Sequence, residues 1–348
     1  MSTQRRMCIL TDGYLDLFTA KTAVGLLRYC PDEVVVVVDS HHAGSDLASL
    51  VGCGAGVPVV DSIQAAVGYR PDHLVIGVAL PGGRFPDAWR RHILDGLAAG
   101  MHVINGLHMH LANDPEILAA AARAQRRIVD VRAVTQPREV GTARARSTRA
   151  RRVLTVGTDC NLGKRLTAME LTRALQARGV HAEFLATGQT GVMITGSGIV
   201  VDAVLSDFVS GAVEAGVLER GDADVVIVEG QGALMHPSYS AVSLGLLHGA
   251  VPDRMILCHA PLRGRFRNTD VPLPPLPETI RLYEALLRPL HAGRVAGVAL
   301  NCHGMAEDAY RETLDRIRSE TGLPTVDCIR DGAGVLVDAV LADDETDP

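Results

Sequence analysis

The chain has 348 residues, a length typical of about two domains at ~150 residues each. Its net charge of −6 argues against a nucleic-acid-binding protein, and its 47% hydrophobic but only 3% aromatic residues predict aliphatic cores. The chain has seven cysteines but no CxxC pair, and its start does not resemble a signal peptide, which favours a cytoplasmic enzyme over a secreted protein. It also has no apolar run of ~18 residues, which disfavours a membrane protein.

Short strand patterns alternate with helix patterns in the first part of the chain. Strands are expected at residues 7–11, 33–38, 57–60, 74–79, 102–104 and 127–131, and helices at 19–29, 87–99 and 115–125. This alternation predicts an open parallel sheet covered on both faces, in a Rossmann-like α/β domain over residues 1–137. The loop after the first strand lacks the GxGxxG fingerprint, which disfavours NAD binding.

A basic segment follows, since residues 138–152 contain six arginines and few apolar residues. We interpret it as a solvated linker, and favour that interpretation over a patch for nucleic acid or another anion. Beyond it, strands are expected at residues 153–156, 181–186, 225–228, 254–258 and 295–300, and helices at 163–178, 203–215, 277–290 and 306–318. Residues 153–348 are therefore predicted to form a doubly wound α/β domain of the P-loop NTPase-like type.

A phosphate-binding motif begins where the strand at residues 153–156 ends, with the sequence Gly-Thr-Asp-Cys-Asn-Leu-Gly-Lys at residues 157–164. Strand, glycine-bounded loop with a terminal Gly-Lys, and helix are the parts of a P-loop. In such a loop the backbone N–H groups, the positive helix end and the lysine face phosphate. The ligand-binding residues expected here are Gly157, Thr158, Asp159, Cys160, Asn161, Gly163 and Lys164.

Arg165 occupies the position where a nucleotidase normally places Ser or Thr on magnesium. Metal-assisted hydrolysis of a triphosphate is therefore in doubt, and Arg165 either binds another phosphate or faces solvent. Cys160 lies near a helix N-terminus, which is expected to lower its pKa; a small residue fitting the tight loop is favoured over a thiol nucleophile. His236, His259 and His303 have no metal-ligand spacing, so no metal site is predicted.

Two polar residues follow strands at the edge where doubly wound sheets bind ligands. Glu229 comes after the apolar run 225–228, and its carboxylate can hold hydrated magnesium, accept a proton or brace the glycine-rich turn that follows. Asn301 comes after the last long strand, where an Asn suits either a ligand base or amide or a tight turn.

A further loop is expected at residues 187–191, with Gly188, Gln189 and Thr190 as candidate ligand-binding residues. The alternative is an ordinary flexible turn. Asp202 precedes a helix pattern and has the local signature of an N-cap.

The motifs also resemble known proteins. The P-loop is similar to that of dethiobiotin synthetase, which shares the G-T-D-x3-G-K spacing but has Thr after its lysine. A wider resemblance, over nearly the whole chain, is to a bacterial family of two-domain P-loop proteins long labelled as of unknown function. The matching stretches are residues 10–13, 81–83, 105–108, the P-loop, 187–191, 201–203, 206–208 and 229–232. One characterised member of that family is a D-glutamate N-acetyltransferase.

The resemblance implies the family's fold and N-acetyl transfer from acetyl-CoA to D-glutamate or a close amino acid. Acetyl-CoA carries a pyrophosphate and a 3′-phosphate, so the P-loop would anchor it as a co-substrate. We expect Glu229, or Asp202 as second candidate, to be the catalytic base. The partners would be small molecules and, by default, further copies in a homo-oligomer, with no nucleic acid or membrane.

Two alternatives remain open at this point. One is an ATP- or GTP-dependent ligase or carboxylase similar to dethiobiotin synthetase, and the other is a non-catalytic nucleotide switch or metal-delivery protein. Both need a magnesium nucleotide, and Arg165 counts against firm magnesium binding.

Overall fold

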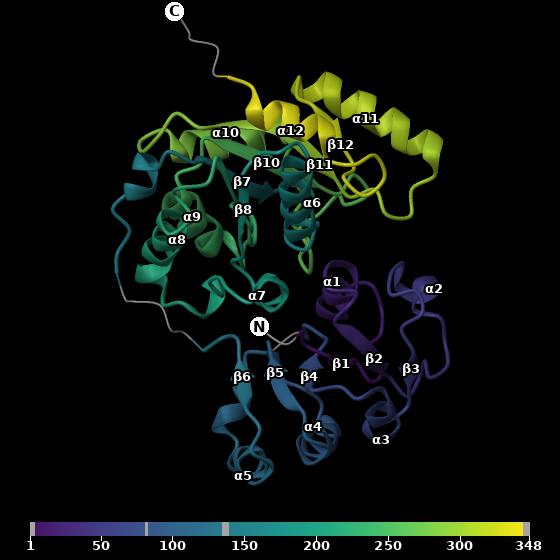
Figure 1. Ribbon diagram of the computed structural model, residues 1–348. Coiled ribbons are helices and arrows are strands. Elements are labelled where there is room, and N and C mark those ends of the chain that lie inside the picture. Colours follow the sequence, from purple (N-terminus) through teal and green to yellow (C-terminus); the bar gives the residue numbers. More distant parts are fainter. Residues whose placement is uncertain (1–3, 81–82, 134–138, 344–348) are drawn as a thin grey trace, which may run out of the picture. The chain divides into compact units, whose positions relative to one another are not determined.

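The computed structural model describes residues 4–80, 83–133 and 139–343 (Figure 1). The chain divides into two compact units. The first comprises Met1–Thr135 with Val192–Gly196, and the second Gln136–Gly191 with Ser197–Pro348. Within the described ranges, no helix is long and apolar enough to cross a lipid bilayer.

The first unit is built on a parallel sheet of six strands in the order β3-β2-β1-β4-β5-β6. The strands are β1 (Met7–Leu10), β2 (Val34–Val38), β3 (Val59–Val60), β4 (His73–Ile76), β5 (His102–Asn105) and β6 (Ile128–Asp130). The helices are α1 (Lys21–Tyr29), α2 (Leu47–Val51), α3 (Ile63–Ala66), α4 (Trp89–Ala98) and α5 (Pro115–Ala124). This strand order is that of a Rossmann-type domain, so the predicted fold class is confirmed here.

Alternate side chains of these strands form two cores, one on each face of the sheet. In β1, Leu10 packs on the face covered by α3, α4 and α5, whereas Ile9 packs on the face covered by α1 and α2. The short helices α2 and α3 were not predicted, because about one helical turn shows no hydrophobic period. Asp46 and Ser62 are the N-caps of α2 and α3, and their side chains accept hydrogen bonds from backbone N–H groups in the first turn of each helix.

The second unit contains another parallel sheet, in the order β12-β11-β10-β7-β9-β8. The strands are β7 (Arg151–Gly157), β8 (Ala182–Leu185), β9 (Val225–Val228), β10 (Arg254–His259), β11 (Arg294–Leu300) and β12 (Thr325–Val326). The helices are α6 (Lys164–Ala177), α7 (Gln189–Thr195), α8 (Val209–Leu218), α9 (Ser240–Ala250), α10 (Leu276–Leu287), α11 (Glu307–Thr321) and α12 (Gly334–Leu341). The strand before the P-loop, β7, lies at the centre of this sheet, between β10 and β9.

Helices cover both faces of this second sheet, as the doubly wound prediction requires. Leu154 of β7 belongs to the core under α8, α9, α10 and α11, and the neighbouring Val153 belongs to the core under α6 and α12. The prediction missed α9 because its sequence, SAVSLGLLHGA, has no charged residue and so no polar face to reveal a helical period.

The predictions for residues 187–215 are wrong in two respects. The helix predicted at residues 203–215 begins at Val209, because two separate 3-10 turns, η5 (Val201–Ala203) and η6 (Ser206–Phe208), come first. Asp202 lies in the first of these turns and is therefore not a helix N-cap. Residues 187–191 are only partly a loop, since α7 starts at Gln189.

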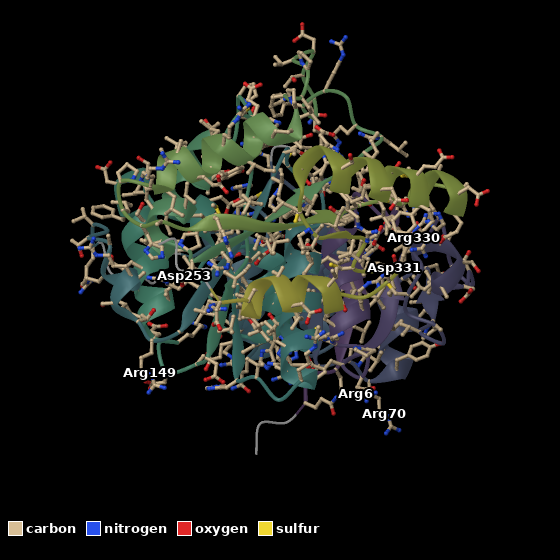
Figure 2. All side chains as sticks on the ribbon, turned by 90° about the horizontal axis from the view of Figure 1, so that it is seen from above. Arg6, Arg70, Arg149, Asp253, Arg330 and Asp331 are labelled. Atoms are coloured by element: carbon tan, nitrogen blue, oxygen red, sulfur yellow. The ribbon has the colours of Figure 1, made fainter. Side chains whose placement is uncertain are left out.

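The basic segment is only partly the solvated linker that its composition predicted. Arg149 is exposed and extends away from the fold, whereas residue 138 lies outside the described residues (Figure 2). Strand β7, however, begins inside the segment, earlier than predicted. Arg152 in this strand is 3% exposed, because the carboxylate of Asp253 binds its guanidinium at 2.5 Å. A paired arginine can be buried where an unpaired one cannot.

Candidate functional site

The P-loop connects β7 to α6 through two residues in the left-handed region, Asn161 at φ 53° and Gly163 at φ 103°. A Cβ on Gly157 would lie 2.9 Å from Lys164 Nζ and 3.0 Å from Asp159 O. A side chain at this position would therefore fill the loop's interior. The predicted strand, loop and helix are thus assembled into a compact cradle of the kind that holds phosphate.

Lys164 is the buried cation of this cradle, with 6% of its surface exposed. Its Nζ donates a hydrogen bond to Asp159 O at 2.7 Å, inside the loop. Burial lowers the pKa of Lys164, because desolvation disfavours the charged form. An anion bound in the loop would oppose that effect and stabilise the charged ammonium.

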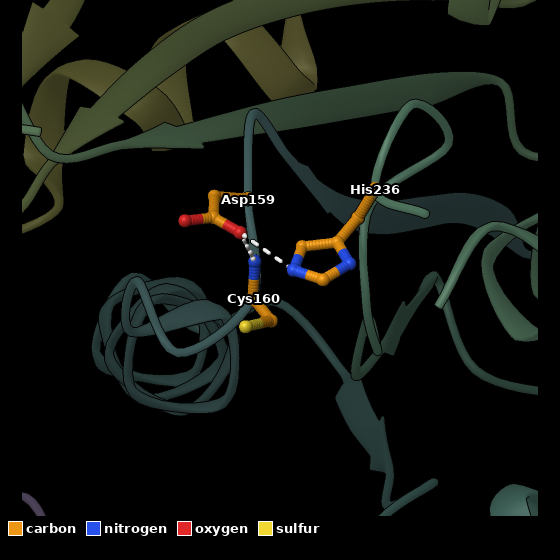
Figure 3. Close-up of side chains that lie close together, drawn as sticks. All are labelled: Asp159, Cys160 and His236. Carbon is orange, nitrogen blue, oxygen red and sulfur yellow. Dashed lines mark hydrogen bonds and ion pairs between the residues drawn. The ribbon is translucent and has the colours of Figure 1, made fainter. Parts of the chain in front are cut away.

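Asp159 stabilises the P-loop through a fully buried carboxylate. Its Oδ1 accepts a hydrogen bond from Cys160 N at 2.6 Å and lies 3.5 Å from His236 Nε2 (Figure 3). Its Oδ2 accepts hydrogen bonds from Arg263 Nη1 at 2.8 Å and Arg267 N at 2.9 Å. These contacts join the P-loop to two distant segments, neither of which the sequence analysis had connected with it.

Asp159, Cys160 and His236 each offer a potential metal-binding atom, and these three atoms lie within 4.8 Å of one another. The donor set does not suit a metal ion. Ser238 N donates to His236 Nδ1 at 3.1 Å, so a neutral His236 carries its proton on Nε2, the nitrogen that faces Asp159. The Arg263 guanidinium already neutralises the Asp159 carboxylate.

The expected lowering of the Cys160 pKa is wrong. Burial and the neighbouring Asp159 carboxylate raise the pKa of this thiol, and they outweigh the nearby cations. Cys160 is half-buried. The electrostatics therefore favour the thiol over the nucleophilic thiolate, in keeping with a small residue that fits the loop.

Three residues from other strands and helices hold the rest of the loop. Tyr283 of α10 donates its hydroxyl proton to Gly157 O at 2.9 Å and accepts from Gly157 N at 3.3 Å. His259 Nδ1 lies 3.0 Å from the hydroxyl of Thr158, and burial lowers the pKa of this imidazole to about 4. Asn301 Nδ2 donates to the loop carbonyl at residue 162, which places this predicted residue at the P-loop.

Glu229 follows β9 and is 3% exposed. Its Oε2 accepts hydrogen bonds from Thr187 N at 3.0 Å and Gly188 N at 3.1 Å. Burial raises the pKa of Glu229, although the charge of Arg165 and these hydrogen bonds act in the opposite direction. A buried carboxylate with a raised pKa at the carboxyl edge of the sheet has the properties of a general base.

Glycines let the backbone approach both Glu229 and the P-loop closely. A Cβ on Gly191 would lie 2.4 Å from Glu229 Oε2, and a Cβ on Gly230 would lie 1.6 Å from Thr155 O and 3.2 Å from Lys164 Cδ. Gly230 N also donates to Thr155 Oγ1 at 2.9 Å. The turn that carries Glu229 is therefore packed directly on β7 and against the side chain of the P-loop lysine.

The start of α7 completes this polar region. Gln189 and Thr190 are buried, and among the described residues Gln189 Oε1 has no hydrogen-bond partner. Gln231 Nε2 donates to Thr187 Oγ1 at 3.2 Å. Asp202 is exposed, but the preceding residue donates its backbone N–H to Thr187 O, so Asp202 lies next to the same segment. Most of the predicted residues thus gather around Glu229 and the P-loop.

One known protein family shares this two-domain organisation. Residues 139–337 match the model of the DUF1611 C-terminal P-loop domain, a domain of unknown function. The chain belongs to the DUF1611 family. Residues 40–134 match that family's N-terminal Rossmann-like domain, in agreement with both predicted domain types. A crystal structure of a DUF1611 protein from Anabaena variabilis has a TM-score of 0.94 with 42% identity, and the match covers 97% of this chain and 100% of that one.

Two curated relatives carry a functional name. A protein named D-glutamate N-acetyltransferase from Tritonibacter scottomollicae is 36% identical over 332 residues, which cover 94% of this chain and 96% of the relative. A second protein of that name, from a Pseudoalteromonas species, is 34% identical over 79% of this chain and 83% of its own length. This DUF1611 protein therefore has relatives, matched over most of their length, that are named as transferases.

Proposed function

We propose that this DUF1611 protein is an N-acetyltransferase that moves an acetyl group from acetyl-CoA to the amino group of D-glutamate or a close amino acid. The observation that carries the proposal is the buried carboxylate of Glu229 beside the P-loop cradle. The names of the two relatives support the reaction class and the acceptor.

The P-loop fits the phosphates of acetyl-CoA. Gly157 leaves the interior of the loop open, and Lys164 supplies a buried cation. Binding of an intact thioester also needs no hydroxyl ligand for magnesium after the lysine, and Arg165 occupies that position. We assign Thr158, Asn161 and the loop backbone to the phosphates of the bound thioester.

Glu229 would act on the acceptor. An amino acid arrives as an ammonium, which is not nucleophilic until it loses a proton. The ionised Glu229 carboxylate accepts that proton, and the freed nitrogen lone pair forms the new C–N bond. Bound acetyl-CoA supplies the acetyl thioester, whose C–S bond breaks as the thiolate leaves. The nitrogen loses its second proton as the amide forms, and this proton neutralises the departing thiolate. Asp202 is the second candidate for the base, because it lies beside the same segment.

The decisive measurement is thiol release from acetyl-CoA with D-glutamate, with L-glutamate and with no acceptor, each with and without ATP and magnesium. We expect release that requires D-glutamate and does not require ATP. Stoichiometric N-acetylglutamate should be detected by mass spectrometry in the same reaction. Absence of release with every acceptor, together with amino-acid-dependent ADP formation, would refute the proposal in favour of an ATP-dependent ligase.

A further inference from the structure

The loop after β10 carries three arginines at alternate positions, Arg263, Arg265 and Arg267. Part of it folds into a hairpin, in which Phe266 N donates to the carbonyl of residue 271 at 2.9 Å and residues 265 and 272 form an antiparallel bridge. Because β10 is the neighbour of β7, this hairpin lies at the same edge of the sheet as the P-loop.

The three arginines differ in what their charges contact. Arg263 Nη1 donates to Asp159 Oδ2 at 2.8 Å and to Cys160 O at 2.7 Å, so its charge already braces the P-loop. Arg265 is exposed and donates within the hairpin to the carbonyl of residue 270. Arg267 is half-buried as a residue, and its guanidinium makes no hydrogen bond or ion pair with any described residue.

The backbone of Arg267 is fixed on both sides. Its N–H donates to Asp159 Oδ2 at 2.9 Å, and its carbonyl accepts from His236 Nε2 at 3.2 Å. The preceding Phe266 is 3% exposed and packs edge-on against the ring of His236, with centroids 5.5 Å apart. The backbone contact with Asp159 holds Arg267 beside the P-loop, and its positive charge acts to lower the pKa of the Cys160 thiol against the larger effect of burial.

The guanidinium of a half-buried arginine that pairs with no residue in the described part of the chain, held beside a phosphate cradle, suits an additional phosphate. We propose that Arg267 binds a phosphate group of the ligand other than those held by the loop amides and Lys164. This inference rests on the proposed function: in acetyl-CoA the additional group is the 3′-phosphate. A terminal phosphate monoester carries more charge than either phosphate of the pyrophosphate and can accept two parallel hydrogen bonds from the guanidinium.

The test is isothermal titration calorimetry of CoA and 3′-dephospho-CoA on the wild type, Arg267→Gln and Arg265→Gln. Arg265 is a matched control, since it lies in the same hairpin and its charge contacts the hairpin carbonyl of residue 270. The wild type should bind CoA roughly 10- to 100-fold more tightly than dephospho-CoA, as a charge-assisted hydrogen-bond pair implies. In Arg267→Gln this ratio should fall to about threefold or less, and in Arg265→Gln it should stay at the wild-type value.

Each outcome separates the inference from the function on which it rests. An unchanged ratio in Arg267→Gln would overturn the role of Arg267, while acetyl transfer by the wild type would leave the proposed function intact. If the wild type binds neither form of CoA and transfers no acetyl group, both are overturned. The substitution should not unfold the protein, because the hydrogen bonds of Arg267 with the described residues use its backbone; a melting curve checks this.

Discussion

Tyr283→Phe tests whether a single hydroxyl from a distant helix holds the start of the P-loop. Tyr283 is 2% exposed, and its hydroxyl donates to Gly157 O at 2.9 Å. The hydroxyl oxygen of Tyr283 also accepts hydrogen bonds from Gly157 N and Leu234 N, each at 3.3 Å. Burial raises the pKa of Tyr283 to about 12, so the hydroxyl keeps its proton throughout the neutral range.

The expected loss of stability in Tyr283→Phe follows from the polar groups that lose their hydrogen-bond partner. Phenylalanine keeps the ring and its packing, but Gly157 N and Gly157 O lose this partner in a buried place, and Leu234 N loses it in a partly buried one. An unsatisfied buried polar group costs about 1–3 kcal/mol, and the two long bonds should lie at the lower end. We therefore expect the free energy of unfolding of the second unit to fall by about 2–4 kcal/mol.

Urea unfolding followed by far-ultraviolet circular dichroism should show the loss as a lower midpoint. Tyr239→Phe is the control, because Tyr239 is 43% exposed, and it should change stability by less than about 0.5 kcal/mol. The chain's one tryptophan, Trp89, lies in the first unit, so its fluorescence should report a transition that this substitution moves less. If Tyr283→Phe unfolds within about 0.5 kcal/mol of the wild type, the hydroxyl does not support the loop and this reasoning is refuted.

Three further outcomes are expected. Glu229→Gln should lower kcat by roughly 10²- to 10⁴-fold with little change in KM for acetyl-CoA. In the wild type, kcat/KM should fall as the pH drops through the raised pKa of Glu229, and this fall should be absent in the variant. Lys164→Met should weaken CoA binding about tenfold or more in calorimetry, and equal affinity would show that the cradle is not the phosphate site. The folded pKa of His259, about 4, lies below its unfolded value of ~6.5, so acid favours the unfolded chain. Between pH 7 and pH 4, protonation of His259 should lower the free energy of unfolding of the wild type by up to about 3 kcal/mol. In urea melts, the free energy of unfolding of His259→Asn should fall measurably less over the same range.

The sequence predicted best those elements whose signal is local. The strand at residues 225–228 was placed at the bounds that β9 has, because four aliphatic residues between polar ends leave little choice. The P-loop was equally readable, since its glycines, lysine and following helix are adjacent in the chain. The start of α7 could not be predicted in this way. The residues before it, Thr187 and Gly188, donate backbone hydrogen bonds to Glu229, which lies about forty positions away in the sequence.

The supporting residues of the site were missed for the same reason. Tyr283, His236 and Arg267 come from α10, from the segment before α9 and from the hairpin after β10, and none belongs to a short motif. The alternating arginines after β10 were the one signal in the sequence that could have drawn attention to the hairpin. Their different contacts, with Asp159, with the hairpin itself and with no described residue, depend on the fold.

Arg165 illustrates how the fold changes the meaning of a residue. In the sequence it marks the loss of a hydroxyl that would hold magnesium. In the structure its charge acts on Glu229, where it opposes the effect of burial on the pKa. Burial alone would keep this carboxylate protonated to higher pH, and a protonated carboxyl cannot accept a proton from an ammonium. A cation after the P-loop lysine therefore favours the ionised, basic form of Glu229, the form that the proposed acyl transfer to an amine requires.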